Sequence, residues 1–408
     1  MATGRAAGSR SGRNRRDSSL PPAFRHDPAK ALLRIEDVPF APVRWSKEPA
    51  VCDFRTLSFT PGNAAGEIPV PICSTPAVLV DLGVIVASYD GHVRLFDRKL
   101  ERLIWERRLS GGIYASLVFD LSRRTVIAAT INGIVACMTL RGAILWRADI
   151  GAPVHATPTV VAASDLLIVA AFNSLCKGLN LETGEIVFTT RLQEPWHAAY
   201  GSAIAHRDPY ATPVALPNGD IVLCCAEEAL CLGPDGAVRW RCPIGHSIRA
   251  SPVALHAWKE IAICSVDGSC TFVDQVDGVV RTSIAIGGKL LASPAVSDGI
   301  LVVGTTDDCV VALDVQTKTV VWKRTGGAPR DHSSFSTMPD GSFVSTGMRG
   351  NVVGLRREDG AFLWETNQQL GLAGVAPAVD ITPIVVEDGS MYCGSYSGVL
   401  FHYKFDGA

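Results

Sequence analysis

A short motif, an Ala-Ser/Thr-Pro-like sequence, recurs along this chain, and seven of the eight residues directly before it are polar or aromatic. In chain order the eight are Cys73, Tyr114, His155, Tyr210, Arg249, Leu291, Ser334 and Asp380. An arginine binds anions through its fixed fork of N–H donors, whereas histidine, tyrosine and aspartate can exchange protons with a substrate. Arg249 could therefore clamp an anion, with Asp380 as its opposite charge, and His155, Tyr114 and Tyr210 could handle protons. The alternative is a hydrated channel lined by polar residues that bond to one another.

These residues belong to a repeat. One position of the repeat, usually a tryptophan, recurs mostly 40 to 42 residues apart, each time four residues after a turn. The residues at this position are Trp105, Trp146, Phe188, Trp240, Thr282, Trp322 and Trp364. Each repeat also contains an apolar run that ends in a hairpin turn such as Asp90-Gly91, and then a third short run. Glycine favours such turns because type I′ geometry needs positive φ at both central positions. Four short strands at this period, rich in Val, Ile and Ala, are typical of one blade of a β-propeller.

The repeats predict an all-β, eight-bladed β-propeller of four-stranded antiparallel blades. Seven whole blades are expected at about 74–109, 115–150, 156–192, 211–244, 250–286, 292–326 and 334–370. An eighth, from about 381 to 407, lacks an outer strand, and the matching tryptophan occurs in Pro42-Val43-Arg44-Trp45. We therefore expect an N-terminal strand at residues 42–46 to complete the last blade, which leaves no open sheet edge at the junction. A seven-bladed ring with one repeat misread is the alternative.

Two polar loops are expected at the mouth of the ring. The spacing from Phe188 to Trp240 is ten residues wider than usual, and the extra segment, 194–208, contains Trp196, His197 and His206. Insertions in propellers lie in loops on one face, often the binding face. The segment is therefore expected to be a lid over the central funnel, or else a surface loop capped by one buried tryptophan. The second loop, 326–332, contains Arg330 and His332 and either shares this mouth or forms a local salt bridge.

The repeat resembles that of a known family. The Ala-Ser-Pro start, the strand Val310-Val311-Ala312-Leu313-Asp314 and the Asp-Gly-x-x-x-Trp pattern are similar to quinoprotein-type (PQQ-like) propeller repeats, over about residues 42–408. Proteins with this repeat include PQQ-dependent alcohol dehydrogenases, the lipoprotein of the outer-membrane β-barrel assembly machine, and the C-terminal propeller of β-alanine-activating proteins. The resemblance implies the fold and leaves the activity open, because function resides in sites carried by folds.

The sequence argues against PQQ and against a bound metal. Cys224-Cys225 resembles the vicinal cysteines of the dehydrogenases, but it lies inside the apolar run that begins at Ile221. No cluster of calcium-ligating Glu, Asn and Asp stands at the matching positions. A zinc site would need His197, His206 and a rim histidine to converge. We therefore predict no cofactor and no metal.

Composition favours a cytoplasmic protein. The net charge of −2 does not indicate a broad nucleic-acid surface, and no apolar stretch is long enough to span a bilayer. The twelve cysteines are scattered singly, mostly inside strands, as a reducing cytosol tolerates. Residues 1–40 are expected to form a disordered, basic Arg/Ser/Gly-rich tail, with a transit peptide or a weak electrostatic arm as alternatives, and residues 41–408 a single propeller domain.

Two functions are consistent with these patterns. The first is a cytoplasmic propeller that binds a small molecule or a protein partner at its central funnel, without PQQ and without chemistry. The second is a cofactor-free enzyme of specialised metabolism, with substrate under the 194–208 lid, oriented by Arg249 and served by His155, Tyr114, Tyr210 or Asp380. Rim residues that converge on one cavity would favour a ligand or substrate site, whereas a splayed rim would favour a scaffold.

Overall fold

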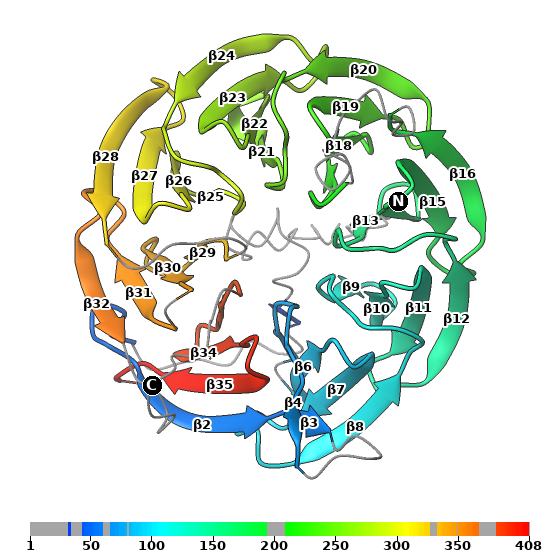
Figure 1. Cartoon of the computed structure of the whole chain (residues 1–408), viewed down its shortest axis with the longest axis vertical. Coiled ribbons are helices and arrows are strands. Elements are labelled where there is room, and N and C mark those ends of the chain that lie inside the picture. Colours follow the sequence, from blue (N-terminus) through cyan, green and yellow to red (C-terminus); the bar gives the residue numbers. More distant parts are fainter. Residues whose placement is uncertain are drawn as a thin grey trace, which may run out of the picture.

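The computed structural model describes residues 32–33, 43–59, 66–79, 81–193, 209–326, 333–348, 350–366 and 381–407. Eight sheets surround a common axis (Figure 1), and neighbouring strands within each blade run antiparallel. The predicted eight-bladed propeller is confirmed, and the seven-bladed alternative is wrong. We number the blades 1 to 8 in chain order.

Each blade begins with a short innermost strand beside the axis. In blades 1 to 8 these strands are β5 (Ala77–Leu79), β9 (Val118–Asp120), β13 (Thr159–Val161), β17 (Val214–Ala215), β21 (Val253–Leu255), β25 (Ala295–Ser297), β29 (Ser336–Thr337) and β33 (Ile384–Val385). The second strands are β6 (Gly83–Ala87), β10 (Thr125–Ala129), β14 (Leu166–Ala171), β18 (Ile221–Cys225), β22 (Glu260–Cys264), β26 (Ile300–Gly304), β30 (Phe343–Thr346) and β34 (Ser390–Cys393).

The chain then moves outward from the axis. The third strands are β7 (His92–Phe96), β11 (Ile134–Thr139), β15 (Leu175–Asn180), β19 (Glu228–Leu232), β23 (Ser269–Asp274), β27 (Cys309–Asp314), β31 (Val352–Leu355) and β35 (Val399–Lys404). The outer strands are β8 (Leu103–Arg108), β12 (Ile144–Asp149), β16 (Ile186–Arg191), β20 (Val238–Pro243), β24 (Val280–Ala285), β28 (Thr319–Thr325), β32 (Phe362–Thr366) and, in blade 8, β2 (Ala50–Thr56).

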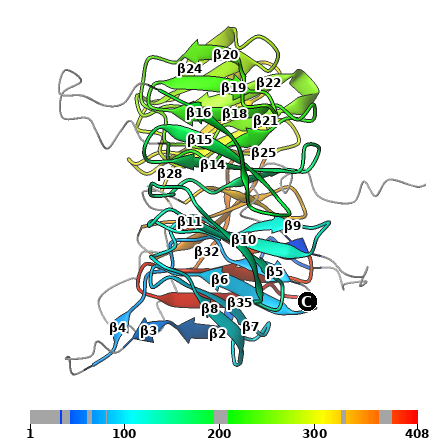
Figure 2. The same cartoon turned by 90° about the vertical axis from the view of Figure 1, so that its right-hand side faces the viewer.

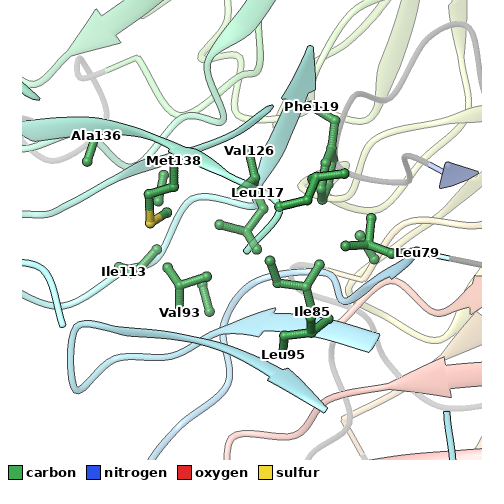
Figure 3. Packing of buried hydrophobic residues seen from close by; sticks show 14 of the residues in the cluster. Leu79, Ile85, Val93, Leu95, Ile113, Leu117, Phe119, Val126, Ala136 and Met138 are labelled. Atoms are coloured by element: carbon green, nitrogen blue, oxygen red, sulfur yellow. The ribbon is translucent and has the colours of Figure 1, made fainter. Parts of the chain in front are cut away.

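The hydrophobic core lies between the blades. Second strands such as β6 and β10 are buried along their whole length, which explains why they read as continuous apolar runs rather than as alternating patterns. Figure 3 shows one such layer, where Ile85 and Leu95 of blade 1 face Val126 and Met138 of blade 2. Outer strands such as β20 alternate between exposed and buried residues because only one face meets a neighbouring blade.

The recurring tryptophan and the turn glycine join neighbouring blades. Trp240 donates its indole N–H to the carbonyl oxygen of Gln275 in the next blade at 3.2 Å. In the same turn, Gly278 has φ +73°, and a Cβ there would lie 2.6 Å from the Trp240 ring. Only glycine fits both conditions. The indole bond recurs between Trp105 and Leu140, Trp146 and Leu181, and Trp322 and Arg357.

The closure of the ring by a strand from near the N-terminus is confirmed, but the strand is β2, at residues 50–56, and not residues 42–46. β2 pairs antiparallel with β35, from Ala50 opposite Lys404 to Thr56 opposite Val399. Trp45 lies in the turn before β2, and its carbonyl oxygen accepts the indole N–H of Trp364 at 2.8 Å. In blade 2 the accepting carbonyl, that of Leu140, likewise lies in the turn just before the outer strand β12. The tryptophan alignment therefore mistook a turn residue for an outer-strand residue.

Four short elements of the described residues lie outside the four-strand pattern. β1 (Leu32–Leu33) pairs in parallel with β5, at the inner edge of blade 1. β3 (Ser58–Phe59) and β4 (Ile68–Pro69) form a small hairpin that extends beyond the body of the ring (Figure 2). A 3₁₀ helix, η5 (His256–Trp258), connects β21 to β22. Within the described residues, no helix has the length and hydropathy needed to cross a membrane. The division into a tail and one domain at residues 40 and 41 stays a prediction.

Candidate binding site at the central channel

Four of the predicted rim residues lie side by side on consecutive blades. Tyr114, His155, Tyr210 and Arg249 each stand four residues before the innermost strand of their blade. Since these strands all run the same way along the axis, the residues meet on one face of the ring. They line a cavity of about 190 Å³ at the axis, so the predicted convergence of the rim on one cavity is observed for these four residues.

The four residues and Phe172 form a continuous cluster, which we call the aromatic arc. The His155 ring stacks on Phe172 with centroids 4.3 Å apart and planes at 12°, and it lies 5.0 Å from the Tyr114 ring. Tyr210 meets Phe172 edge-on at 4.8 Å. The Arg249 guanidinium carbon lies 4.2 Å from the centroid of the Tyr210 ring, within cation–π range. These contacts fix the orientation of the arginine at the edge of the cavity.

Sequence reasoning missed Phe172. It follows β14 directly, in the hairpin turn, and its N–H donates to the carbonyl oxygen of Pro153 at 3.0 Å. That bond brings the turn against the residues that precede β13, and therefore against His155. The same backbone bond recurs in other blades whatever the side chain, from Tyr89 to Pro71 and from Val266 to Ser247, so the usable signal was the position, the first residue of the hairpin turn.

Among the described residues that line the cavity, the charged side chain is that of Arg249. Burial lowers the pKa of His155, so this imidazole is neutral at neutral pH. Burial also raises the pKa of the Cys73 thiol to about 12, which leaves it protonated. No aspartate or glutamate occurs among the described residues that line the cavity, and none of the described ion pairs involves Arg249.

The serines and threonines of the Ala-Ser/Thr-Pro-like motif form a second feature, which we call the hydroxyl belt. Backbone N–H groups of one blade donate to the motif hydroxyl of the next at 2.8–3.1 Å, in the pairs Thr75–Ser116, Ser116–Thr157, Thr212–Ser251, Ser251–Ser293, Ser293–Ser334 and Ser334–Thr382. Sequence reasoning assigned these hydroxyls no role. Their partners are about forty residues apart, and only the closed ring brings them together.

The belt also corrects the register of blade 7. Ser334 was predicted to be a rim residue, but its hydroxyl accepts the N–H of Ser293, as a belt residue does. In the other blades the rim residue stands two positions before the belt residue, which in blade 7 corresponds to His332 in the sequence, outside the described residues. The sequence Ser336-Thr337, which resembles the motif, is the innermost strand β29 itself. On this side of the cavity the lining is less aromatic and includes Leu291, Ile381 and Val385.

The remaining predicted site residues lie outside the described part of the chain: Asp380, Trp196, His197, His206, Arg330 and His332. The lid over residues 194–208, the loop over 326–332 and the acidic partner of Arg249 therefore stay predictions. Within the ranges that the structure does describe, no group of three or more His, Cys, Asp or Glu side chains is placed to hold a metal ion.

Fold and channel together define a β-propeller of the PQQ-like repeat class with a polar and aromatic axial cavity. The family described as "Outer membrane protein assembly factor BamB" matches residues 89–224 and 226–406, well over half of the chain. The chain belongs to this family. The resemblance to PQQ-like repeats that the sequence indicated is thereby confirmed.

Individual relatives are distant. The outer membrane protein assembly factors BamB of Yersinia pestis and Shewanella oneidensis are 28% and 29% identical over 31% and 35% of this chain, and the matches span 34% and 38% of those proteins. The corresponding protein of Burkholderia pseudomallei is 23% identical over 77% of this chain and 82% of its own length. The crystal structure of BamB from Moraxella catarrhalis has a TM-score of 0.67 at 17% identity, covering 88% of this chain and 100% of that one. The C-terminal WD40 domain of Sif2 has a TM-score of 0.66 at 11% identity, over 87% of this chain and 99% of that domain. These structural similarities show the fold alone.

Proposed function

We propose that this protein is a non-catalytic binding propeller that holds a protein partner at the mouth of its central channel. The observation that carries the proposal is the aromatic arc, in which Tyr210 orients Arg249 beside the axial cavity. Tyrosine, tryptophan and arginine are enriched among the energetic hot spots of protein interfaces, because they combine a large contact area with polar groups. Relatives that are named assembly factors support a protein as the partner.

The ring holds the arc in a fixed position. Among the described residues the belt joins six of the eight neighbouring pairs of blades. Between blades 3 and 4 the Thr159 hydroxyl donates to the carbonyl oxygen of Pro213 at 2.6 Å, so the arc is held in place before a partner arrives. A preformed surface loses little conformational entropy on binding. The arc thus has the properties of an anchor point, around which the loops of the same face would add contacts.

We also propose that the protein works in the cytoplasm. All twelve cysteines carry thiols, and ten of them are buried. Burial raises the pKa of Cys176 and Cys393 to about 12. Because the thiolate is the reactive form, such thiols are protected from oxidation, but this protection does not replace a reducing environment. Fractionation of cells that express the full chain tests this, and recovery from an oxidising compartment would contradict it.

The enzymatic alternative has less support. An acyl- or group-transfer enzyme needs a nucleophile that an adjacent base activates. In the described residues, no hydrogen bond joins His155 to a hydroxyl or a carboxylate, and its ring is packed against Phe172 instead. The Cys73 thiol at the rim is protonated and therefore a poor nucleophile.

Site-specific crosslinking tests the binding function. A photo-reactive phenylalanine derivative replaces Tyr210 in the full chain, expressed in its own host, and the adducts are identified by mass spectrometry. A parallel chain carries the same group in place of Trp258, in η5. That helix follows the end of β21 and therefore lies on the opposite face. We expect a defined protein adduct from position 210 and none of the same mass from position 258.

The contribution of the arginine is measured in the same assay. Loss of an interface hot spot costs at least about 2 kcal/mol, roughly thirtyfold in affinity, so Arg249→Glu should reduce the adduct sharply. Arg324→Glu, an exposed arginine of β28, is the matched control and should leave it unchanged. Equal adducts in both variants, or identical adducts from positions 210 and 258, would exclude the channel mouth as the binding surface.

A further inference from the structure

The hydroxyl belt has unused donor capacity. Each serine or threonine hydroxyl has one proton to donate and two lone pairs that accept. In the six described links the belt oxygens act as acceptors of backbone N–H groups. None of the hydrogen bonds found among the described residues uses the hydroxyl proton of Ser116, Thr157, Ser251, Ser293, Ser334 or Thr382.

These hydroxyls face the axial cavity. All eight motif residues, the six above with Thr75 and Thr212, line it. Ser116, Thr157, Ser334 and Thr382 are at most 9% exposed, so their protons have little access to bulk water. Thr337 also lines the cavity, and its hydroxyl oxygen is buried without a hydrogen-bond partner among the described residues. The wall of the cavity therefore has a surplus of donors.

The cavity wall that has these surplus donors also carries a positive charge. Arg249 lines the same cavity, and its guanidinium cannot be deprotonated in a protein. A hydroxyl that already accepts an N–H bond becomes a stronger donor, because bonds in a chain polarise one another. No described lining residue is acidic. The preferred occupant of such a wall is a group that only accepts hydrogen bonds and carries negative charge.

The size of the cavity restricts the occupant further. Sites for drug-sized ligands occupy roughly 300–1000 Å³. The axial cavity, at about 190 Å³, is smaller than this range. A single oxyanion group fits the space and chemistry better than a cofactor does.

From the donor ring, the arginine and the cavity size, we infer that the axial channel is an oxyanion-binding site, for phosphate, sulfate or a carboxylate. Arg249 supplies the charge, and the belt hydroxyls supply convergent O–H donors from several blades. The site requires no protein partner. It can therefore exist whether or not the mouth binds a protein, and the two proposals are tested separately.

Isothermal titration calorimetry of the purified full chain with sodium phosphate, at constant ionic strength set by chloride, tests the inference. We expect saturable binding of one phosphate per ring. A hydrogen bond to a charged group contributes about 1.5–3 kcal/mol, so Arg249→Met should weaken binding by about ten- to a hundredfold. Arg324→Met, which removes the same charge from the exposed strand β28, should change it less than twofold.

The belt is tested by Ser293→Ala, which should weaken phosphate binding by about three- to tenfold, and by Ser293→Thr, which keeps the hydroxyl and should restore it. Ser293→Ala also removes the acceptor of the Ser251 N–H, so its melting temperature is measured in parallel. Should that variant fail to fold, the Arg249→Met and Arg324→Met pair still decides the question.

Titrations with sulfate, acetate and N-acetyl-glutamate amide identify the source of the oxyanion. If phosphate and sulfate bind more tightly than the two carboxylates, the natural ligand of the site is a free tetrahedral anion. If the two carboxylates bind more tightly, the natural ligand is a carboxylate side chain. Either result supports the inference. If no probe binds saturably above the chloride background, the channel holds only water and the inference is wrong. It is equally wrong if Arg249→Met binds phosphate as the unmodified chain does.

Discussion

Blades 2 to 7 and blade 8 pack in the same way around the axis but differ in how the chain connects their four strands. In blade 5 one continuous segment, 253–285, forms all four strands, and neighbouring blades meet through a tryptophan on a turn glycine. In blade 8 the outer strand β2 comes from the other end of the chain. At this junction the indole of Trp364 bonds to the carbonyl oxygen of Trp45, which precedes β2. The bond is the same as elsewhere in the ring, but its acceptor is about 320 residues away.

The closing blade carries side-chain contacts that support its non-covalent junction. Phe405 lies between Trp45 and Trp364, with ring centroids 4.9 and 5.4 Å away. On the other side, Arg98 of blade 1 forms an ion pair with Asp388 and donates to the Tyr392 hydroxyl at 3.1 Å. Blade 8 therefore compensates for the missing chain connection with aromatic packing and a half-buried ion pair.

Removal of Phe405 is expected to have the largest effect on this junction. Phe405→Ala leaves a cavity at a side chain that is 1% exposed and should reduce the free energy of unfolding by about 3–5 kcal/mol. Phe272→Ala, at a fully buried position of blade 5, should cost a similar amount. Only Phe405→Ala should accelerate amide hydrogen exchange in β2 and β35 more than in the other blades. Equal acceleration in all blades would show that the ring opens as one unit.

Loss of the ion pair between blades 8 and 1 is expected to have a medium effect. Arg98→Met leaves the largely buried Asp388 carboxylate without its guanidinium and should cost about 2 kcal/mol. Its matched control is Arg356→Met, which breaks the Arg356–Asp359 pair in the turn before β32, where both side chains are about half exposed. An exposed pair contributes about 0–1 kcal/mol. Urea unfolding measures the free energy of unfolding of both variants. Equal decreases in Arg98→Met and Arg356→Met would mean that the junction needs no electrostatic support.

The smallest effect concerns pH. His402 stacks on Tyr392 at 4.5 Å, and burial lowers the pKa of its imidazole despite the Asp53 carboxylate 3.1 Å away on β2. The unfolded chain, with a histidine pKa of about 6.5, therefore binds more protons than the folded one below that pH. Stability should fall as the pH drops from 7.5 through 6.5 towards 5.5.

Urea midpoints at these three pH values check the assignment to His402. His402→Phe keeps an aromatic ring against Tyr392 and removes the titrating group, so the midpoint should depend less on pH. His246→Phe, at an exposed histidine, should retain the full dependence. Burial also lowers the pKa of His155, so part of the slope should remain in His402→Phe. An unchanged slope in that variant would assign the pH dependence to groups away from the junction.

Much of the fold was predictable because the relevant interactions are local. Hairpin turns, apolar second strands and the start of each innermost strand can all be recognised within one repeat. The rim positions Tyr114, His155, Tyr210 and Arg249 followed from the same alignment and do meet at one cavity. Two errors arose where the local pattern was ambiguous. Trp45 resembles an outer-strand tryptophan but lies in a turn, and Ser334 resembles a rim residue but belongs to the belt.

The sequence alone favoured eight blades over seven and located the start of every blade except the seventh, because a blade is built from turns and strands whose signals lie within about forty residues. Only the tertiary structure decided which strand closes the ring, that Phe172 stacks on His155, and that the motif hydroxyls bond from blade to blade. The pairing that closes the ring and the belt bonds join residues of different repeats. They exist because eight similar sheets are placed around one axis, where equivalent atoms of successive repeats come within hydrogen-bond distance.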